Sequence, residues 1–331
     1  MSYVLAVDGG GTKTHAILYN IVDHTVLLTD GGATNHEYLK GGFSELRQRL
    51  CLMIDNLKRQ GNIRIEDIAH SVWGMAGLDT ASQRDVIAGF IGDMGFSGFT
   101  LCNDTCLAIK AGTKHGYGIC LLAGTGPNTV GLNHKNQVFQ IAGQLELTGD
   151  FGGGMMIGKA AVRTVYKNLF RYHKETILNK LLLDSYGISS KYELMDKVME
   201  NAESGNTPIP SLAKLVFDAA NMGDRQSVKM LERMGREYAL NTKSLTEELD
   251  FPADEAIEIV LAGSLFTKNW SEIHIKSLRK WLNRVMKCSY TLVTLKEPPI
   301  MGALAWALNN VGCANSFELA RESIPRVFPK R

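Results

Sequence analysis

The sequence predicts a two-domain α/β protein whose second half repeats the opening of the first, with a helical insertion late in the chain. Three observations lead to this prediction. A strand, a glycine turn and a second strand open the chain, the same arrangement returns near residue 118, and strands alternate with helices after the first turn. At 331 residues the chain is long enough for two domains of ordinary size.

The opening hairpin is predicted from apolar runs at residues 3–7 and 16–19, which flank Asp8-Gly9-Gly10-Gly11-Thr12-Lys13-Thr14. The second run is short and rich in strand formers, so no helix follows the turn. Rossmann and P-loop phosphate loops run from a strand into a helix, and this turn therefore belongs to neither class. Glycine amides, two threonine hydroxyls and a lysine at a hairpin tip can still bind phosphate, although an ordinary turn would carry the same glycines.

Helices and strands alternate over the rest of the first third. One helical stripe of apolar residues predicts an amphipathic helix over residues 44–60, with Ser44 as its N-cap and Gly61 as its stop. The pattern then predicts a buried strand over residues 69–75, a helix over 83–94, a strand over 99–102 and a helix over 105–111.

The opening pattern restarts at Gly118. A strand over residues 118–122 leads into Gly124-Thr125-Gly126-Pro127-Asn128, and a second strand over 129–132 leads out of it. Gly9, Gly11 and Thr14 align with Gly124, Gly126 and Thr129 at one constant offset. Two glycine matches can arise by chance, but matching strands on both sides favour duplication.

The second half contains a mostly helical insertion from residue 158 to about residue 248. It then predicts an apolar strand over 257–262 ending at Gly263-Ser264, a helix over 270–286, a strand over 290–295 and a closing helix over 301–308. We expect an N-terminal domain of residues 1–115, joined by residues from about 312 onward, and a C-terminal domain of residues 116–311.

Composition narrows the partners to small molecules. The formal net charge is +2, and the lysines and arginines are spread along the sequence, which gives no sign of a nucleic-acid or membrane surface. No apolar run resembles a signal peptide or a membrane span, so we expect a cytoplasmic protein. The six cysteines form no CxxC pair and no Cys/His cluster, which favours reduced core thiols.

Two aspartates lie where strands are predicted to end. Asp8 ends the first strand and is placed to hold a hydrated magnesium ion, although capping of the turn explains it equally well. Asp104 follows the strand over 99–102, at the edge where ligands bind open α/β sheets. It is placed to act as a general base toward a substrate hydroxyl, but from the residues alone a helix cap by Asn103-Asp104 is the simpler interpretation.

Three further segments are candidates for ligand contact. The run Gly149 to Gly154 is dense in glycine and carries one carboxylate, Asp150, which suggests close approach of the backbone to a ligand. The turn Gly263-Ser264 would let a flat ring approach the backbone. The loop Ala33-Thr34-Asn35-His36 offers a hydroxyl, an amide and an imidazole suited to sugar hydroxyls, although a single loop histidine is more often solvent-facing.

Six short motifs carry a resemblance to a known family: DGGGTKT at 8–14, ATNH at 33–36, CND at 102–104, AGTGPN at 123–128, GD at 149–150 and AGS at 262–264. In their order and spacing the chain resembles the BadF/BadG/BcrA/BcrD ATPase family over nearly its full length, and within it the N-acetylglucosamine and glucosamine kinases. The resemblance implies the ribonuclease H-like fold of actin, hexokinase and Hsp70, with a central nucleotide cleft. It also implies ATP and Mg²⁺ as cofactors and a homodimer.

The resemblance assigns roles to the candidate residues. The N-terminal domain would bind sugar and phosphate, and the C-terminal domain would bind the nucleotide. Asp8 would organise Mg²⁺ through water, and Asp104 would be the general base. The implied nucleotide contacts are Asp8, Gly10, Gly11, Thr12, Lys13, Thr14, Gly124, Thr125, Gly126, Asn128, Gly263 and Ser264, and the implied sugar contacts are Asn35, His36, Gly77, Asp104, Gly143 and Asp150.

The chain departs from the family pattern in the region that faces the sugar. Family members usually read GDEGS where this chain has Gly149-Asp150-Phe151-Gly152-Gly153, and a GGWG-like segment where it has Ala142-Gly143-Gln144-Leu145. These changes leave open which sugar and which hydroxyl react.

We therefore expect ATP-dependent phosphorylation of an amino sugar of the N-acetylglucosamine, N-acetylmuramic acid or glucosamine type. One alternative is an ATPase that activates a partner enzyme, like the activators of acyl-CoA dehydratases, which share an iron–sulfur cluster between subunits. The lack of paired cysteines argues against it. A second alternative is a sugar- or nucleotide-binding regulator that has lost catalysis.

Overall fold

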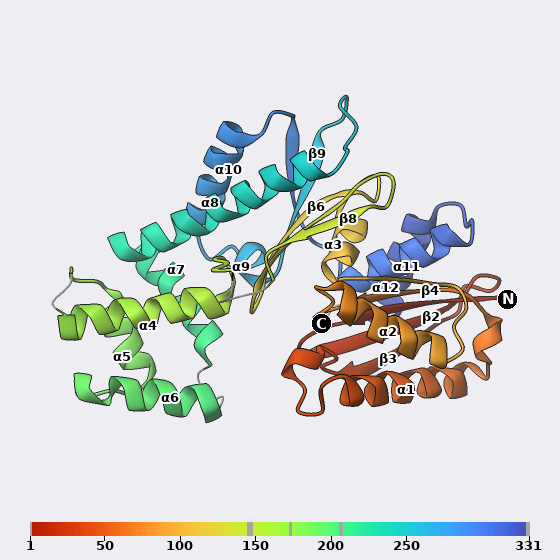
Figure 1. The fold of residues 1–331 in the computed structure, drawn as a ribbon, viewed down its shortest axis with the longest axis horizontal. Helices are drawn as coiled ribbons and strands as arrows, with labels where there is room; N and C mark the ends of the chain where they lie inside the picture. Colours follow the sequence, from red (N-terminus) through yellow and green to blue (C-terminus); the bar gives the residue numbers. More distant parts are fainter. Residues whose placement is uncertain (1, 144–147, 172–173, 205–207, 329–331) are drawn as a thin grey trace. The chain divides into compact units, whose positions relative to one another are not determined.

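The computed structural model describes residues 2–143, 148–171, 174–204 and 208–328 (Figure 1). The chain divides into two compact units. Unit 1 contains Met1–Gly118 and Leu295–Arg331, and unit 2 contains Ile119–Thr294. Each unit is built on a five-stranded sheet covered by helices. No helix among the described residues is long and apolar enough to cross a membrane.

The sheet of unit 1 has the strand order β3-β2-β1-β4-β5. Strands β1, β2 and β3 form an antiparallel meander, whereas β4 and β5 run parallel to β1. The strands are β1 (Tyr3–Gly9), β2 (Lys13–Asn20), β3 (Val26–Gly32), β4 (Ile68–Met75) and β5 (Phe99–Cys102). Because β1, β4 and β5 are parallel, their carboxyl ends lie at one edge of the sheet.

The sheet of unit 2 has the order β10-β9-β6-β7-β8, which repeats the order of unit 1 strand for strand. The strands are β6 (Gly118–Ala123), β7 (Pro127–Leu132), β8 (Val138–Ile141), β9 (Ile257–Ala262) and β10 (Tyr290–Thr294). The predicted α/β duplication is confirmed. The third strand of each meander, β3 or β8, was not predicted, and both are edge strands that are partly buried or exposed along most of their length.

Helices cover both faces of the unit 1 sheet. The helices are α1 (Gly42–Gly61), α2 (Ala81–Asp93), α3 (Thr105–Gly112), α11 (Pro299–Asn310) and α12 (Ser316–Val327). The buried stripe of α1 packs with α2 against Leu5, Val7 and Trp73 in one core cluster. The predicted N-cap of α1 was wrong, because the helix begins two residues before Ser44 with Gly41 at the cap position.

Helix α11 contacts β1, β4 and α3 of unit 1. The sequence interpretation had assigned these residues to the second domain, but their apolar face completes the core of the first unit. Close packing at Gly302 brings α11 against the backbone of α3. The terminal helix α12 was not predicted, and it packs against α11 and β3.

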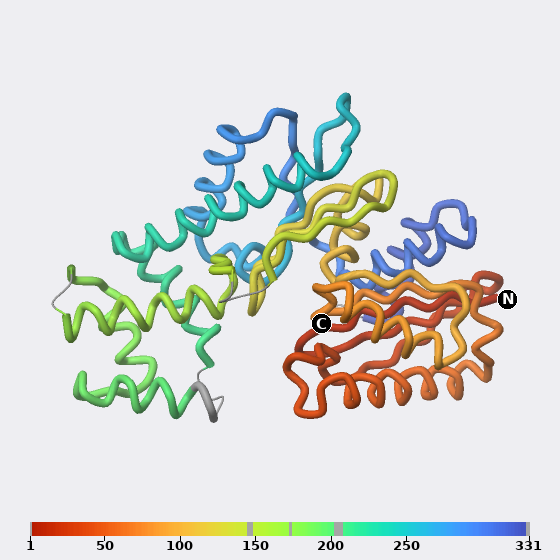
Figure 2. Tube along the Cα trace, in the orientation of Figure 1, coloured from red at the N-terminus to blue at the C-terminus, as the bar shows by residue number. Residues whose placement is uncertain are grey.

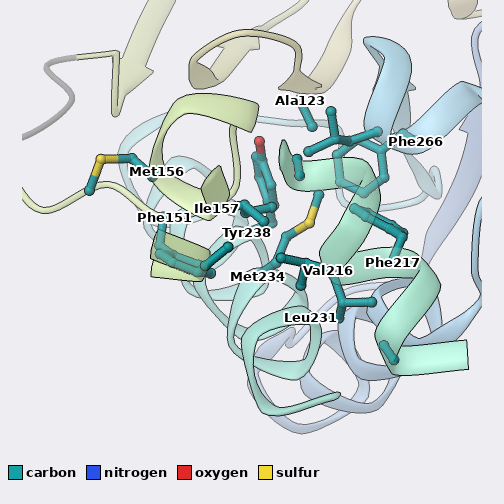
Figure 3. Close-up of a cluster of buried hydrophobic side chains, with 14 of the residues drawn as sticks. Ala123, Phe151, Met156, Ile157, Val216, Phe217, Leu231, Met234, Tyr238 and Phe266 are labelled. Carbon is teal, nitrogen blue, oxygen red and sulfur yellow. The ribbon is translucent and has the colours of Figure 1, made fainter. Parts of the chain in front are cut away.

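Unit 2 carries the predicted helical insertion between β8 and β9, which can be followed along the chain in Figure 2. It comprises α4 (Gly154–Arg171), α5 (Leu178–Ser185), α6 (Leu194–Ser204), α7 (Ala213–Asn221) and α8 (Arg225–Glu248), and α9 (Ser264–Thr267) and α10 (Ile273–Val285) follow β9. Side chains of α4, α7, α8 and α9 meet in one buried cluster, in which the Tyr238 ring lies among Ile157, Met234 and Phe266 (Figure 3).

The close contact between α3 and α11 predicts that a side chain at Gly302 destabilises the protein. A Cβ atom at Gly302 would lie 2.2 Å from the carbonyl oxygen of Leu107 and 2.7 Å from the nitrogen of Ala111. Gly302→Ala should therefore lower the free energy of unfolding by about 1–3 kcal/mol in a urea titration. Gly89→Ala is the control, because Gly89 lies within α2 with nothing close to its missing Cβ. It should raise stability by about 0.5–1 kcal/mol, and equal effects of the two substitutions would contradict the predicted packing.

Candidate active site

Backbone hydrogen bonds fix the turn between β1 and β2. The Gly10 N–H donates to the carbonyl of Lys13 at 3.0 Å, and the Thr34 N–H donates to the carbonyl of Gly10 at 3.0 Å. A Cβ atom at Gly9 would lie 2.7 Å from the Thr34 hydroxyl oxygen, so a side chain there would collide with the neighbouring loop. Gly11, Thr12 and Lys13 remain exposed at the tip of the turn.

Thr14 has a different environment from the exposed tip. Its side chain is fully buried, and its hydroxyl donates to the carbonyl of Gly32 at 2.9 Å. It also shares a hydrogen bond of 2.7 Å with the Thr34 hydroxyl. The Thr14 hydroxyl therefore anchors the loop that carries Asn35 and His36.

Three aspartates lie near the carboxyl ends of the three parallel strands of this sheet. Asp8 lies in β1, Asp79 follows β4 and Asp104 follows β5. Burial raises the pKa of Asp104 to about 7, and the negative charges of Asp8 and Asp79 add to the effect. Burial also raises the pKa of Asp8 to about 6, against the lowering effect of Lys13. Both carboxyl groups thus titrate near neutral pH, although each side chain keeps partial solvent contact.

The neighbouring Asn103, and not Asp104, caps helix α3. The Asn103 side-chain oxygen accepts a hydrogen bond from the Thr105 N–H at 3.0 Å, and its amide donates to Asp79 at 3.0 Å. Asp104 occupies the N-cap position with helical dihedral angles and makes no side-chain capping bond. Its nearest described side-chain partner is the Thr105 hydroxyl at 3.5 Å. Of the pair Asn103-Asp104 to which the sequence assigned the cap, Asn103 thus supplies the capping bond, and Asp104 occupies the cap position without one.

Asp79 was not among the residues singled out in the sequence. The available signal was a carboxylate just after a predicted strand and one residue before Thr80, which caps α2. Its charge acts on Asp104, and its side chain positions Asn103. It therefore belongs to the same carboxylate group as Asp8 and Asp104, which we call the aspartate cluster.

The structure brings Asn35, His36 and Gly77 together beside this sheet edge. Gly77 has a φ of +76°, and a Cβ atom there would lie 2.4 Å from the Asn35 side-chain oxygen and 3.2 Å from His36 Cε1. The His36 ring stacks on Phe43 with centroids 3.9 Å apart. Burial lowers the pKa of His36, and its Nδ1 is buried without a hydrogen-bond partner in the described part of the chain. A neutral imidazole with an unsatisfied nitrogen suits a polar ligand.

In unit 2, the turn between β6 and β7 is also closed by a backbone hydrogen bond, which spans two residues instead of the three of the first turn. The Gly124 N–H donates to the carbonyl of Gly126 at 3.1 Å. The first residues of α4 hold this turn, since the N–H groups of Gly154 and Met155 donate to the carbonyls of Gly124 and Thr125 at 2.9 and 2.8 Å. Thr125 is exposed at the tip. Asn128 is buried, and its side chain accepts from the Thr129 N–H at 2.8 Å.

Three glycine segments of unit 2 meet without room for side chains. A Cβ atom at Gly153 would lie 2.4 Å from the carbonyl carbon of Gly126. One at Gly263, which has a φ of +84°, would lie 2.4 Å from the carbonyl oxygen of Ala123. Gly153 and Gly263-Ser264 are therefore packed directly against the turn that carries Thr125. Backbone groups dominate this surface.

The side chain of Tyr238, from α8, packs against the segment that carries Asp150. A Cβ atom at Gly152 would lie 2.5 Å from the Tyr238 ring, and the Tyr238 hydroxyl donates to the carbonyl of Leu122 at 2.6 Å. Burial raises the pKa of Tyr238 far above its usual value, and Asp150 contributes to this shift. Phe151, a residue that departs from the family pattern, is buried. The guanidinium carbon of Arg233 lies 4.4 Å from the centre of its ring. Tyr238 thus positions both the turn and the Asp150 segment.

Gly143 has a φ of +102° and lies at the end of a described segment. Gln144 and Leu145, which depart from the GGWG-like pattern, lie outside the described residues. The structure therefore places Gly143 in unit 2 but does not bring it into a described contact with the other candidates.

Comparisons with known proteins give a consistent result. An N-acetylmuramic acid/N-acetylglucosamine kinase of Clostridium acetobutylicum is 26% identical over 307 residues, covering 92% of this chain and 97% of that protein. An N-acetyl-D-glucosamine kinase of Dictyostelium discoideum is 21% identical over 267 residues, covering 78% of this chain and 84% of that protein.

A structure solved for Chromobacterium violaceum as a candidate N-acetylglucosamine kinase matches with a TM-score of 0.66 and 21% identity, covering 97% of this chain and 99% of that one. This likeness confirms the fold expected from the duplicated sheets. The sequence profile of the BadF/BadG/BcrA/BcrD ATPase family matches residues 5–307, almost the whole chain. The chain therefore belongs to the BadF/BadG/BcrA/BcrD ATPase family.

Proposed function

We propose that this chain is an ATP- and magnesium-dependent kinase that phosphorylates a hydroxyl group of an amino sugar. The observation that carries the proposal is the state of Asp104, whose carboxylate is not engaged in capping and has a pKa near 7. The relatives named as kinases of N-acetylmuramic acid and N-acetylglucosamine support the choice of an amino sugar.

Asp104 would act as the general base. A base is most effective when its pKa lies near the working pH, and Asp104 meets that condition. As the sugar hydroxyl attacks the γ-phosphorus of ATP, its proton passes to Asp104 and a new P–O bond forms. The bond from the γ-phosphorus to the oxygen that bridges it to the β-phosphate breaks, and ADP leaves with that oxygen. Asn35, His36, Gly77, Gly143 and Asp150 would hold the sugar in position for this attack.

The two glycine turns would bind the phosphates of ATP. Each tip offers backbone amides and an exposed hydroxyl, from Thr12 in one turn and Thr125 in the other. The exposed Lys13 adds a positive charge to the first turn. In unit 2 the close backbone approach at Gly263-Ser264 would border the adenosine.

The donor set around Asp8 fits a magnesium ion. Mg²⁺ prefers carboxylate oxygens and retains several waters, so one or two carboxylates suffice. The raised pKa of Asp8 indicates that Lys13 does not fully offset the cost of burying its charge. Asp8 would therefore hold the ion through water, and the bound ion would neutralise charge on the phosphates. The transfer itself would depend mainly on positioning and on this neutralisation.

Replacing the proposed base should remove activity without removing nucleotide binding. Asp104→Asn should lower kcat by about 10²–10⁴-fold in a coupled ADP-release assay with an amino sugar. Its affinity for a non-hydrolysable ATP analogue, measured by calorimetry, should stay within about twofold to threefold of the wild-type value, because Asp104 would not contact the nucleotide. Asp85→Asn, an exposed position on α2, is the control and should retain full activity. More than a tenth of wild-type activity in Asp104→Asn would refute the assignment.

The same substitution should stabilise the magnesium-free protein in a pH-dependent way. The pKa of Asp104 is raised from 3.8 to about 7 by folding, so ionising this group opposes folding as pH rises from 3.8 to 7 and the full cost is present above pH 7. Asp104→Asn should therefore raise the free energy of unfolding by about 1–3 kcal/mol at pH 8 and by clearly less at pH 5. Thermal unfolding at both pH values measures this, and an equal gain at pH 5 and pH 8 would contradict the shifted pKa.

A further inference from the structure

A strongly basic groove lies between α8 and α10 of unit 2, and none of the candidate site residues lines it. Its volume is about 620 Å³. The cationic side chains that line it are Lys229, Arg233 and Arg236 of α8 and Lys276 and Lys280 of α10. Helical spacing explains the cluster, because residues three or four positions apart share one face of a helix. The sequence interpretation, which saw cations spread along the chain, therefore missed it.

Nearby acidic groups offset only part of this charge. Glu232 is the one carboxylate among the residues that line the groove. Glu237 lies 3.6 Å from the Arg233 guanidinium, and Glu272 lies 2.8 Å from the Lys276 ammonium. Such solvent-exposed pairs contribute little and leave each cation open to a stronger anionic partner. Since the whole chain carries a formal net charge of only +2, the groove concentrates positive charge locally.

The apolar floor limits what the groove can bind. Val228, Ile273 and Trp281 line it between the cations. The guanidinium groups of Arg236 and Arg284 lie 5.1 and 5.0 Å from the centre of the Trp281 ring. These cation–π contacts occupy the ring, which disfavours the base stacking that single-stranded nucleic acid requires. The volume falls in the range of small-molecule sites.

One lining residue connects the groove to the candidate sugar region. The guanidinium of Arg233 lies 4.4 Å from the centre of the Phe151 ring, and Phe151 is the immediate neighbour of Asp150. Arg233 also lines a second cavity, of about 540 Å³, together with Gly149 and Phe151. An anion that draws Arg233 into the groove would therefore change the contact that covers Phe151.

We propose that the α8–α10 groove binds a small metabolite carrying a diphosphate group and that this binding changes the affinity of the enzyme for its sugar. The five cations outnumber the three nearby carboxylates, so the groove attracts a multiply charged anion such as a diphosphate, and the apolar floor accepts the organic part of the molecule. The coupling to sugar affinity rests on the proposed kinase function, whereas binding in the groove does not.

Calorimetry with inorganic pyrophosphate tests the binding directly. The full chain in magnesium-free, low-salt buffer should bind pyrophosphate, and binding should weaken as salt is raised. The double variant Lys276→Ala with Lys280→Ala should bind about tenfold more weakly or worse. Lys243→Ala with Lys287→Ala removes the same charge outside the groove and should leave the affinity within about twofold. No binding by the wild type, or equal affinity in the two double variants, would overturn the proposal.

The coupling has its own measurement. In the ADP-release assay, pyrophosphate should shift the sugar KM of the wild type by at least about twofold. The groove variant should show the wild-type KM without pyrophosphate and no groove-dependent shift with it. Binding in the groove with an unchanged KM would refute the coupling. An absence of sugar-dependent ADP release would instead count against the kinase function, and the calorimetric result would still stand on its own.

Discussion

One electrostatic constraint dominates the candidate site of unit 1, the gathering of Asp8, Asp79 and Asp104 at the carboxyl ends of three parallel strands. Burial and mutual repulsion raise the pKa of Asp104, so the fold carries an unfavourable charge that its cores must offset. Asn103 takes over the capping of α3 and links it to Asp79. The same arrangement disfavours the ionised form of Asp104 and raises its pKa to about 7, the property on which its proposed role as a base rests.

In unit 2 the candidate residues around the β6–β7 turn are mostly glycines, so backbone groups and not side chains form the contacts there. Gly153 lies against Gly126, and Gly263 lies against Ala123 and Gly124, so a Cβ atom at Gly153 or Gly263 would collide with the β6–β7 turn. Tyr238 holds this assembly through Leu122 and Gly152. A surface made of backbone amides suits phosphate groups, which have many acceptor oxygens and no donors.

The sequence predicted the features that local pattern determines. Both glycine turns, their flanking strands and the duplication follow from apolar runs and glycine spacing. The edge strands β3 and β8 were missed because their pairing comes from neighbours. The sequence could not show whether Asn103 or Asp104 caps α3, because either side chain can accept the capping hydrogen bond and only the backbone geometry decides between them. Asp79 and the basic groove depend on elements that tertiary packing brings together.

Sugar-dependent ADP release by the wild-type protein is the most direct test of the account. A coupled assay should compare amino sugars, uronic acids and neutral hexoses in the presence of ATP and Mg²⁺. The account predicts that ADP release without sugar is slow and that at least one amino sugar accelerates it well beyond the neutral hexoses. If no sugar in the panel accelerates ADP release, the proposed kinase function is contradicted.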